Sequence, residues 1–202
     1  MAFSGTAEAN STVRIFEGTT LKATTTAGTT GAWSKTLTGV ANGRHTYTAK
    51  ATDKANNTSA ASASKTVIVD KVKPKVLSTN PLAGATGVLP GTNVVANFSE
   101  AMNANTLRNA TTLRSATFKL ARKNPDGTTT AVAAKVSYAV TTTATGAKVY
   151  KATLNPDANL QLGKTYVATV TSGAKDVAGN ALDQSPTVLG DQSKVWTFTV
   201  RR

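Results

Sequence analysis

The stretch RHTYTAKATDKANN, residues 44–57, contains both the strand pattern and the turn pattern that decide the fold. Apolar and polar residues alternate from Arg44 to Thr52, so His45 and Tyr47 share the face that also carries the alanines. The run ends in Asp-x-Ala-Asn-Asn, and Asp-x-Ala-Gly-Asn recurs at 176–180, shortly after the alternating TYVATVT, 165–171. A strand leading into this turn therefore occurs twice in the chain.

We interpret the repeated motif as a self-bonded turn. Its positions are filled by Asp53, Asn56 and Asn57 in the first copy and by Asp176, Gly179 and Asn180 in the second. The aspartate can accept hydrogen bonds from N–H groups two or three residues on, and Asn or Gly readily adopts a left-handed conformation at the fourth position. The final asparagine can tie the outgoing strand through its amide.

The same motif does not match a helix-loop-helix calcium site. Such a loop needs an oxygen ligand at its third position, where the two copies carry Ala55 and Ala178. Asp70 is the only carboxylate in the connection that follows the first repeat, which is too few ligands to predict calcium there. We therefore predict no metal and no cofactor.

Working outward, the rest of the chain predicts short strands separated by turns. Aromatic residues make up only 5% of the sequence, and the segments are rich in Thr, Val and Ala, which favours an all-β fold. The predicted strands are 12–18, 20–27, 32–38, 44–52 and 64–70, then 75–81, 93–99, 117–123, 131–140, 148–154, 165–171 and 195–200. Trp33 is predicted to fill the first core. Residues 100–107 are predicted to form one or two helical turns, and NPDG, 124–127, a hairpin between 117–123 and 131–140.

Pro74 predicts a domain boundary, because it forces Lys73 into an extended conformation and ends the preceding ladder. The predicted domains are residues 1–72 and 73–202, two β-sandwiches joined by a short linker. The chain is long enough for each part to bury a core of its own.

The residues give little support for catalysis. There is no cysteine and only one histidine, His45, which excludes Cys/His pairs and multi-histidine metal centres. We expect no Ser/His/Asp triad either, because we interpret His45 as a packing residue. No glycine-rich phosphate loop is present, and most aspartates lie in turn sequences. Glu100 in FSEAM has two interpretations that stay open: it stabilises the start of a short helix, or it contacts a ligand.

The charge is strongly basic, with 23 Lys and Arg against 10 Asp and Glu and a net charge of +13. Residues 1–72 carry +4 and residues 73–202 carry +9. The basic side chains are scattered, and the densest group is Lys119, Arg122 and Lys123, with few aromatics beside it, so we expect no nucleic acid. This group is a candidate contact for a polyanion. No signal peptide and no apolar run long enough to insert into a membrane is expected from the sequence.

Two resemblances to known families follow from motifs already quoted. Residues 4–70 resemble the repeated bacterial Ig-like domains of large surface adhesins and biofilm-associated proteins, through GTAEANSTV, the Trp33 strand, GRHTYTAKATD with ANNTS, and VIVD. Residues 74–200 are similar to the Ig-like domain first associated with bacterial S-layer proteins, through NPLAGATGV, FSEAM, LGKTYVATV, KDVAGNAL and WTFTV in that order. The segment LDQSPTVLGDQSK departs from the second pattern and predicts a long loop.

Both resemblances imply extracellular, non-catalytic domains arranged in tandem within longer chains. The predicted function is therefore a stalk, adhesion or assembly module of a bacterial surface or secreted protein, with neighbouring domains as partners. Two alternatives stay open: a binding module for anionic envelope polymers or glycans, and accessory domains of a secreted polysaccharide-degrading enzyme.

Overall fold

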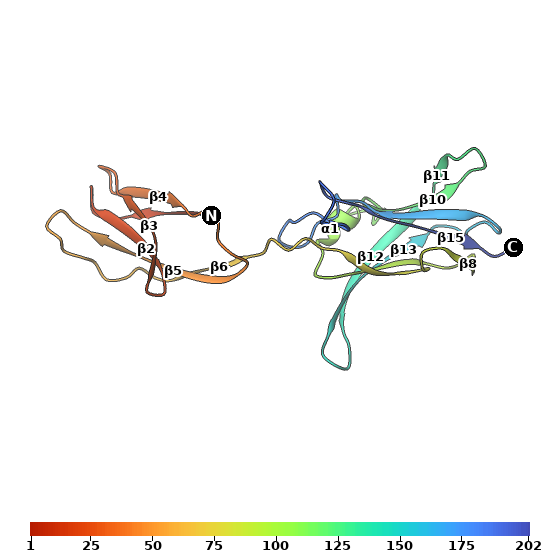
Figure 1. The fold of residues 1–202 in the computed structure, drawn as a ribbon, viewed down its shortest axis with the longest axis horizontal. Coiled ribbons are helices and arrows are strands. Elements are labelled where there is room, and N and C mark those ends of the chain that lie inside the picture. The colour runs from red at the N-terminus through yellow and green to blue at the C-terminus, as the bar shows by residue number, and fades with distance from the viewer. The chain divides into compact units, whose positions relative to one another are not determined.

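The computed structural model describes all residues, 1–202, and divides them into two compact units, residues 1–71 and 72–202. Both units are built from antiparallel strands, with one parallel pair in the second, and the only helix has four residues (Figure 1). The chain is therefore all-β, with two sheets in each unit as in an Ig-like sandwich.

The first unit pairs a two-stranded sheet with a four-stranded sheet. The small sheet is β1 (Ala2–Thr6) with β4 (Ala32–Thr36), and the larger one has the order β3 (Thr20–Thr26), β2 (Thr12–Glu17), β5 (Gly43–Thr52), β6 (Lys65–Val69). The alternation read from the sequence of β5 is present, since Tyr47 is buried and its neighbours Thr46 and Arg44 are more exposed. Strand β1 was not predicted from the sequence.

The core of the first unit is small. Ile15, Leu37 and Tyr47 are its buried cluster, and the ring of Phe3 meets Tyr47 edge to face at 4.9 Å between centroids. Trp33 packs against this cluster while remaining partly exposed, so it covers the core rather than filling it. Its ring lies over Gly5, where a Cβ would come within 2.9 Å of the indole.

The second unit has a five-stranded sheet facing a four-stranded sheet. The first has the order β11 (Thr129–Ala131), β10 (Phe118–Lys123), β14 (Thr165–Val170), β15 (Lys194–Val200), β8 (Ala85–Val88); the second has β12 (Ala134–Thr142), β13 (Lys148–Pro156), β9 (Val94–Phe98), β7 (Val76–Asn80). Phe118, Leu154 and Phe198 are among the fully buried side chains between the sheets. Strands such as β14 and β15 alternate buried and half-buried residues, which is the period-two pattern of a sheet with one face on a core.

Three features of the second unit differ from the sequence-based expectations. The NPDG hairpin joins β10 to the three-residue β11, and the chain then crosses to the other sheet, where β12 pairs with β13. Strand β8 pairs in parallel with β15, a long-range contact with no local sequence signal. The predicted helical turns shrink to α1 (Ala104–Leu107), which begins after the N-cap Asn103.

Candidate functional site

The two repeated turns have the same hydrogen-bond geometry. The backbone N–H of Asn57 donates to Asp53 Oδ1 at 2.8 Å and its side-chain amide to Asp53 Oδ2 at 2.8 Å, and Asn180 makes the same two bonds to Asp176 at 2.8 Å each. The accepted N–H lies four residues on, further than the two or three expected, and the asparagine amide ties the aspartate rather than the outgoing strand. These amide and N–H donors from Asn57 lower the pKa of Asp53.

The fourth position of each turn requires a left-handed backbone. Asn56 has φ 68° and Gly179 has φ 97°. Asparagine and glycine are the residue types that adopt this conformation at least cost, which explains why one copy has asparagine and the other glycine at this position.

The second turn packs against the segment that contains Glu100. Val177 N–H donates to the carbonyl of Ala101 at 3.2 Å, and Asn103 N–H donates to the carbonyl of Lys175 at 2.9 Å. Asp176 is 1% exposed, so its carboxylate is buried where the two segments meet. Glu100 therefore belongs to this turn contact and lies outside the first turn of α1, whose N-cap is Asn103.

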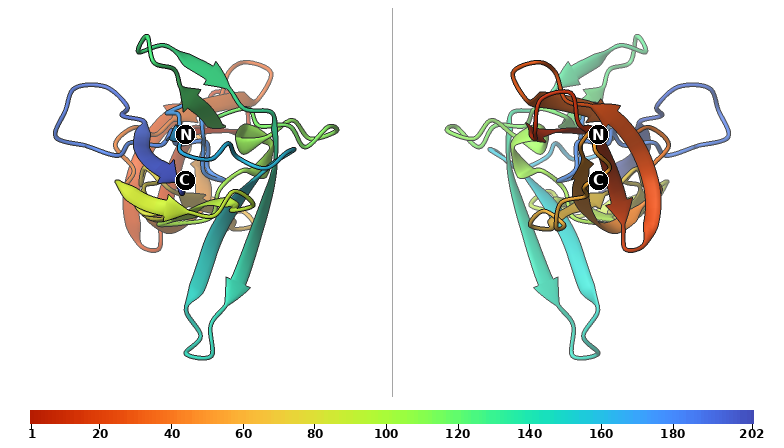
Figure 2. Two further views of the ribbon diagram at one scale, coloured as in Figure 1. Left: turned by 90° about the vertical axis from the view of Figure 1, so that its right-hand side faces the viewer. Right: turned by 90° about the vertical axis from the view of Figure 1, so that its left-hand side faces the viewer.

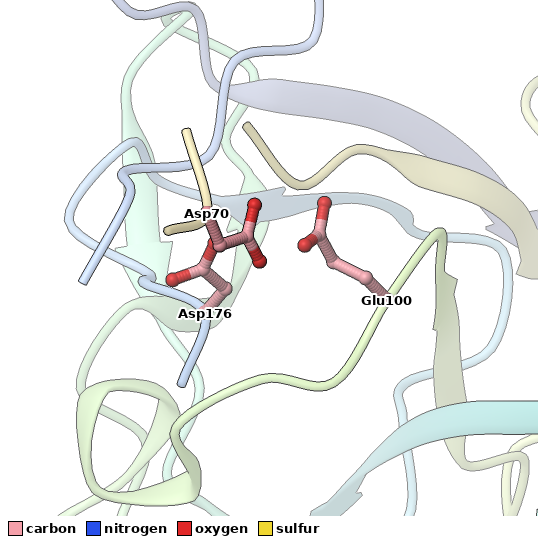
Figure 3. A group of neighbouring side chains, drawn as sticks. All are labelled: Asp70, Glu100 and Asp176. Atoms are coloured by element: carbon pink, nitrogen blue, oxygen red, sulfur yellow. The ribbon is translucent and has the colours of Figure 1, made fainter. Parts of the chain in front are cut away.

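Two carboxylates meet next to this turn. One oxygen of Glu100 and one of Asp176 lie within 4.8 Å of each other, and Figure 3 shows the two side chains. Carboxylate oxygens are the preferred ligands of divalent cations such as Ca²⁺, which takes six to eight oxygens, so two carboxylates provide only part of such a shell. This contact escaped the sequence analysis, because the two residues are far apart in the chain and only the unexplained Glu100 gave any hint.

The remaining acidic residues of the second unit are bound in turns or ion pairs. Asp126 accepts from the N–H and hydroxyl of Thr128, and Asp157 pairs with Arg114. Lys73 pairs with the buried Asp183 and with Asp191. Each of these carboxylates is therefore engaged by a hydrogen-bond donor or a cation.

His45 is held by two hydrogen bonds in the first unit. Its Nδ1 lies 2.6 Å from Glu17 Oε1 and its Nε2 lies 3.0 Å from the carbonyl of Ala41. Glu17 also pairs with Lys22 at 2.9 Å. The hydrogen bonds from Lys22 and, to a smaller extent, from His45 lower the pKa of Glu17. Both ring nitrogens are therefore engaged within the first unit.

The three basic residues proposed from the sequence as a polyanion contact lie on β10 but not on one surface. Lys119 and Lys123 are exposed and share one face of the strand, because they are four residues apart. Arg122 lies on the other face and donates to Gln161 Oε1 at 2.6 Å and to Asn124 Oδ1 at 3.4 Å. The three do not form one basic patch.

Two hollows of the first unit share part of their lining. They have volumes of ≈ 490 and ≈ 530 Å³, and both are lined by Thr6, Trp33, Ala49 and Ser62. Ser62 lines both hollows and Ser59 the first, and their hydroxyls accept from the N–H groups of Ala49 and Ala51 on β5. Glu8, Lys50 and Asp53 also line the first hollow, where Asp53 is bonded to Asn57. The only helix, the four-residue α1, is too short to cross a membrane.

Comparison with known proteins identifies the family of both units. Family models described as bacterial Ig-like domain match residues 1–71 and 70–200. No curated protein matches the chain. Among solved structures, the N-terminal part of the bacterial S-layer protein SbsC is 22% identical, with a TM-score of 0.37 over 64% of this chain, and the match spans 24% of that structure.

Two further structures are similar along almost the whole chain. The fibronectin(III)-like modules of CbhA from Clostridium thermocellum are 14% identical, with a TM-score of 0.33, covering 99% of this chain and 85% of theirs. Latent PorU from Porphyromonas gingivalis is 13% identical, with a TM-score of 0.33, covering 98% of this chain and 20% of its own. Since the two family matches together span residues 1–200 and agree with the sandwich topology, the chain belongs to the bacterial Ig-like domain family.

Proposed function

We propose that this chain is a non-catalytic structural module of a bacterial surface or secreted protein, and that it transmits load within a stalk or surface assembly. Domains of this family are typically non-catalytic. The proposed partners are neighbouring domains of a longer chain. The adhesin-like and S-layer-like sequence motifs support an extracellular location.

One observation supports the proposal that this unit transmits mechanical load: its last strand is hydrogen-bonded on both sides. β15 pairs antiparallel with β14 and parallel with β8. Val200 N–H donates to the carbonyl of Lys164 on the β14 side at 3.0 Å, and Arg201 N–H donates to the carbonyl of Val88 on the β8 side at 3.0 Å. A pull along β15 therefore loads both rows of hydrogen bonds at once.

The two ends of the second unit are attached to different sheets. β7, the first strand, belongs to the four-stranded sheet and β15 to the five-stranded sheet. The chain enters this unit at one end and leaves it at the other (Figure 1). Extending the unit thus requires its strands to slide past one another and its core to open, rather than one edge strand to peel away.

Single-molecule extension tests this proposal. The chain contains no cysteine, so Val72→Cys with Arg202→Cys gives unique attachment points at the two ends of the second unit. We expect one cooperative rupture at a force several-fold higher than that for opening a hairpin, since all strand contacts must fail together.

The matched control opens a hairpin in the same unit. Ser137 and Thr153 face each other on β12 and β13, so Ser137→Cys with Thr153→Cys pulls these strands apart one bond at a time. Equal rupture forces for the two attachment pairs would remove the support for a load-bearing role.

A further inference from the structure

The β12–β13 hairpin extends beyond the body of the second unit (Figure 2). β13 pairs with β9 only from Tyr150 to Leu154, whereas the hairpin continues through Thr142 and Lys148 to its tip. Val140 lies at the base of the projecting part, opposite Tyr150, and is 49% exposed. The outer edge of β12 is therefore accessible without interference from the sandwich.

The hydrogen-bond pattern shows which backbone groups point to that edge. Asp157 N–H donates to the carbonyl of Ala133, and Thr143 N–H to the carbonyl of Ala147, so odd-numbered residues of β12 bond across the hairpin. In an antiparallel ladder the residues between them point the other way. Tyr138, Val140 and Thr142 thus direct their N–H and C=O groups outward.

Part of this edge is covered and part is not. At Val136, the N–H donates to the carbonyl of Leu113 at 2.8 Å and the carbonyl accepts from Arg108 Nη1 at 3.0 Å. From Tyr138 to Thr142 no residue of the chain bonds the outward backbone groups. The free edge begins where the 108–115 segment ends.

The other sheet edges of this unit are better protected. β11 has three residues and β8 has four, and short edge strands offer little template for pairing. The end of β7 is capped by Gln184, which accepts from Val76 N–H at 3.0 Å and donates to its carbonyl at 3.2 Å. Charges, prolines and bulges are the other usual devices, and residues 136–147 contain no charged residue and no proline.

We infer that the free edge of β12, residues 138–142, pairs antiparallel with the same edge of a second copy of this chain. A two-fold axis at Val140 places Val140 opposite Val140 and Tyr138 opposite Thr142, with about six backbone hydrogen bonds across the axis. The side chains that meet are Tyr138, Val140 and Thr142 on one face and Ala139 and Thr141 on the other. Half-exposed Val140 is covered by its symmetry mate.

Charge favours a second copy at this edge over any other surface of the chain. Two chains of net charge +13 repel each other, and the uncharged hairpin is where they can approach. In the two-fold arrangement the nearest lysines, Lys148 and Lys151, lie roughly 14 Å or more from those of the other copy by strand spacing and rise. This exceeds the Debye length of about 8 Å at physiological salt, so repulsion between them is largely screened. The inference does not depend on where the protein is located or on the load-bearing role.

Sedimentation of the full chain over a concentration series at physiological salt tests the pairing. Val140→Pro removes an outward N–H without removing a bond to β13, and Val140→Lys places a charge on the axis. We expect a monomer–dimer equilibrium for the natural chain and an increase of at least tenfold in Kd for both variants. Val195→Lys, which adds the same charge at a valine 55% exposed on β15, should change Kd less than twofold.

Cross-linking tests the register. Two Cα atoms in a hydrogen-bonded antiparallel pair lie about 5.5 Å apart, within the range a disulfide spans. Val140→Cys should therefore form a disulfide-linked dimer on mild oxidation, and Val195→Cys should not. The inference is overturned if the natural chain stays monomeric to about 1 mM, which is the result expected if the edge binds a strand of another protein. It is also overturned if the chain dimerises and both Val140 variants leave the dimerisation unchanged.

Discussion

Asp183 illustrates how a single buried carboxylate is made tolerable in this fold. Its side chain is almost fully buried and accepts from the N–H groups of Ser185 at 3.2 Å and Gln192 at 3.3 Å, and from Lys73 Nζ at 3.3 Å. Burial by itself raises the pKa of Asp183, but the N–H groups of Gln192 and Ser185, together with Lys73, lower it more than burial raises it. The hydrogen bonds that Lys73 donates to Asp191 and, to a smaller extent, to Asp183 raise the pKa of Lys73.

These shifts fix the direction of a pH dependence. Because the pKa of Asp183 is lowered by folding, its contribution to stability is present above the unfolded value of about 3.9 and is lost as the pH falls through the folded value. We expect Asp183→Asn to lower the urea midpoint of the second unit at pH 7 and to weaken the loss of stability on acidification. Asp191→Asn removes only an exposed partner of Lys73 and should have the smaller effect. Equal midpoints for Asp183→Asn and the natural chain would contradict this assignment.

The pairing of β1 with β4 depends on a close backbone approach at Gly31. Ala7 N–H donates to the carbonyl of Gly31 at 2.9 Å, and a Cβ on Gly31 would lie 2.4 Å from the carbonyl oxygen of Ala7. Gly31 also has φ 80°. Both the conformation and the lack of space exclude a side chain where the two strands diverge.

We expect Gly31→Ala to destabilise the first unit by about 2–4 kcal/mol, the sum of a left-handed backbone and a steric clash. Gly39→Ala is the control: Gly39 has φ 68° but nothing within 4 Å of its Cβ position, so it should cost about 1–2 kcal/mol. Urea unfolding followed by Trp33 fluorescence, in a Trp196→Phe background, measures both. A cost for Gly31→Ala no larger than for Gly39→Ala would show that the strands can move apart.

The strands found by alternation and those missed differ in what stabilises them. Segments such as 44–52 and 165–171 pack one face on a core, so their period-two pattern is visible in the sequence and their bounds match to within about two residues. β8 and β11 are short and lack buried runs, and they are strands only because β15 and β10 supply their hydrogen bonds. No local pattern encodes such a partner.

The two units bury cores of very different size. The buried cluster of the first unit is Ile15, Leu37 and Tyr47, while that of the second draws on nearly every strand of both its sheets. Small domains bury a smaller fraction of their surface and are correspondingly less stable. Each unit has a core of its own, so each can unfold as a cooperative body.

Calorimetry of the full chain should therefore show two transitions, with the first unit melting roughly 10 °C or more below the second. Each unit contains one tryptophan, Trp33 or Trp196, so Trp33→Phe and Trp196→Phe variants assign the transitions by fluorescence. A single transition in which both tryptophans change together, with equal calorimetric and van't Hoff enthalpies, would contradict independent cores.

The sequence by itself determined the all-β class and the family, and it supported the interpretation of the Asp53 and Asp176 turns as self-bonded. These conclusions were possible because alternation, turn chemistry and linear motifs are local properties of the chain. Only the tertiary structure decided that Glu100 meets Asp176, that Arg122 faces away from Lys119 and Lys123, that β8 joins β15 in parallel, and that the edge of β12 is left free. Each of these depends on which distant segments pack together, and that choice is made by the summed burial of both sheets rather than by any single stretch of residues.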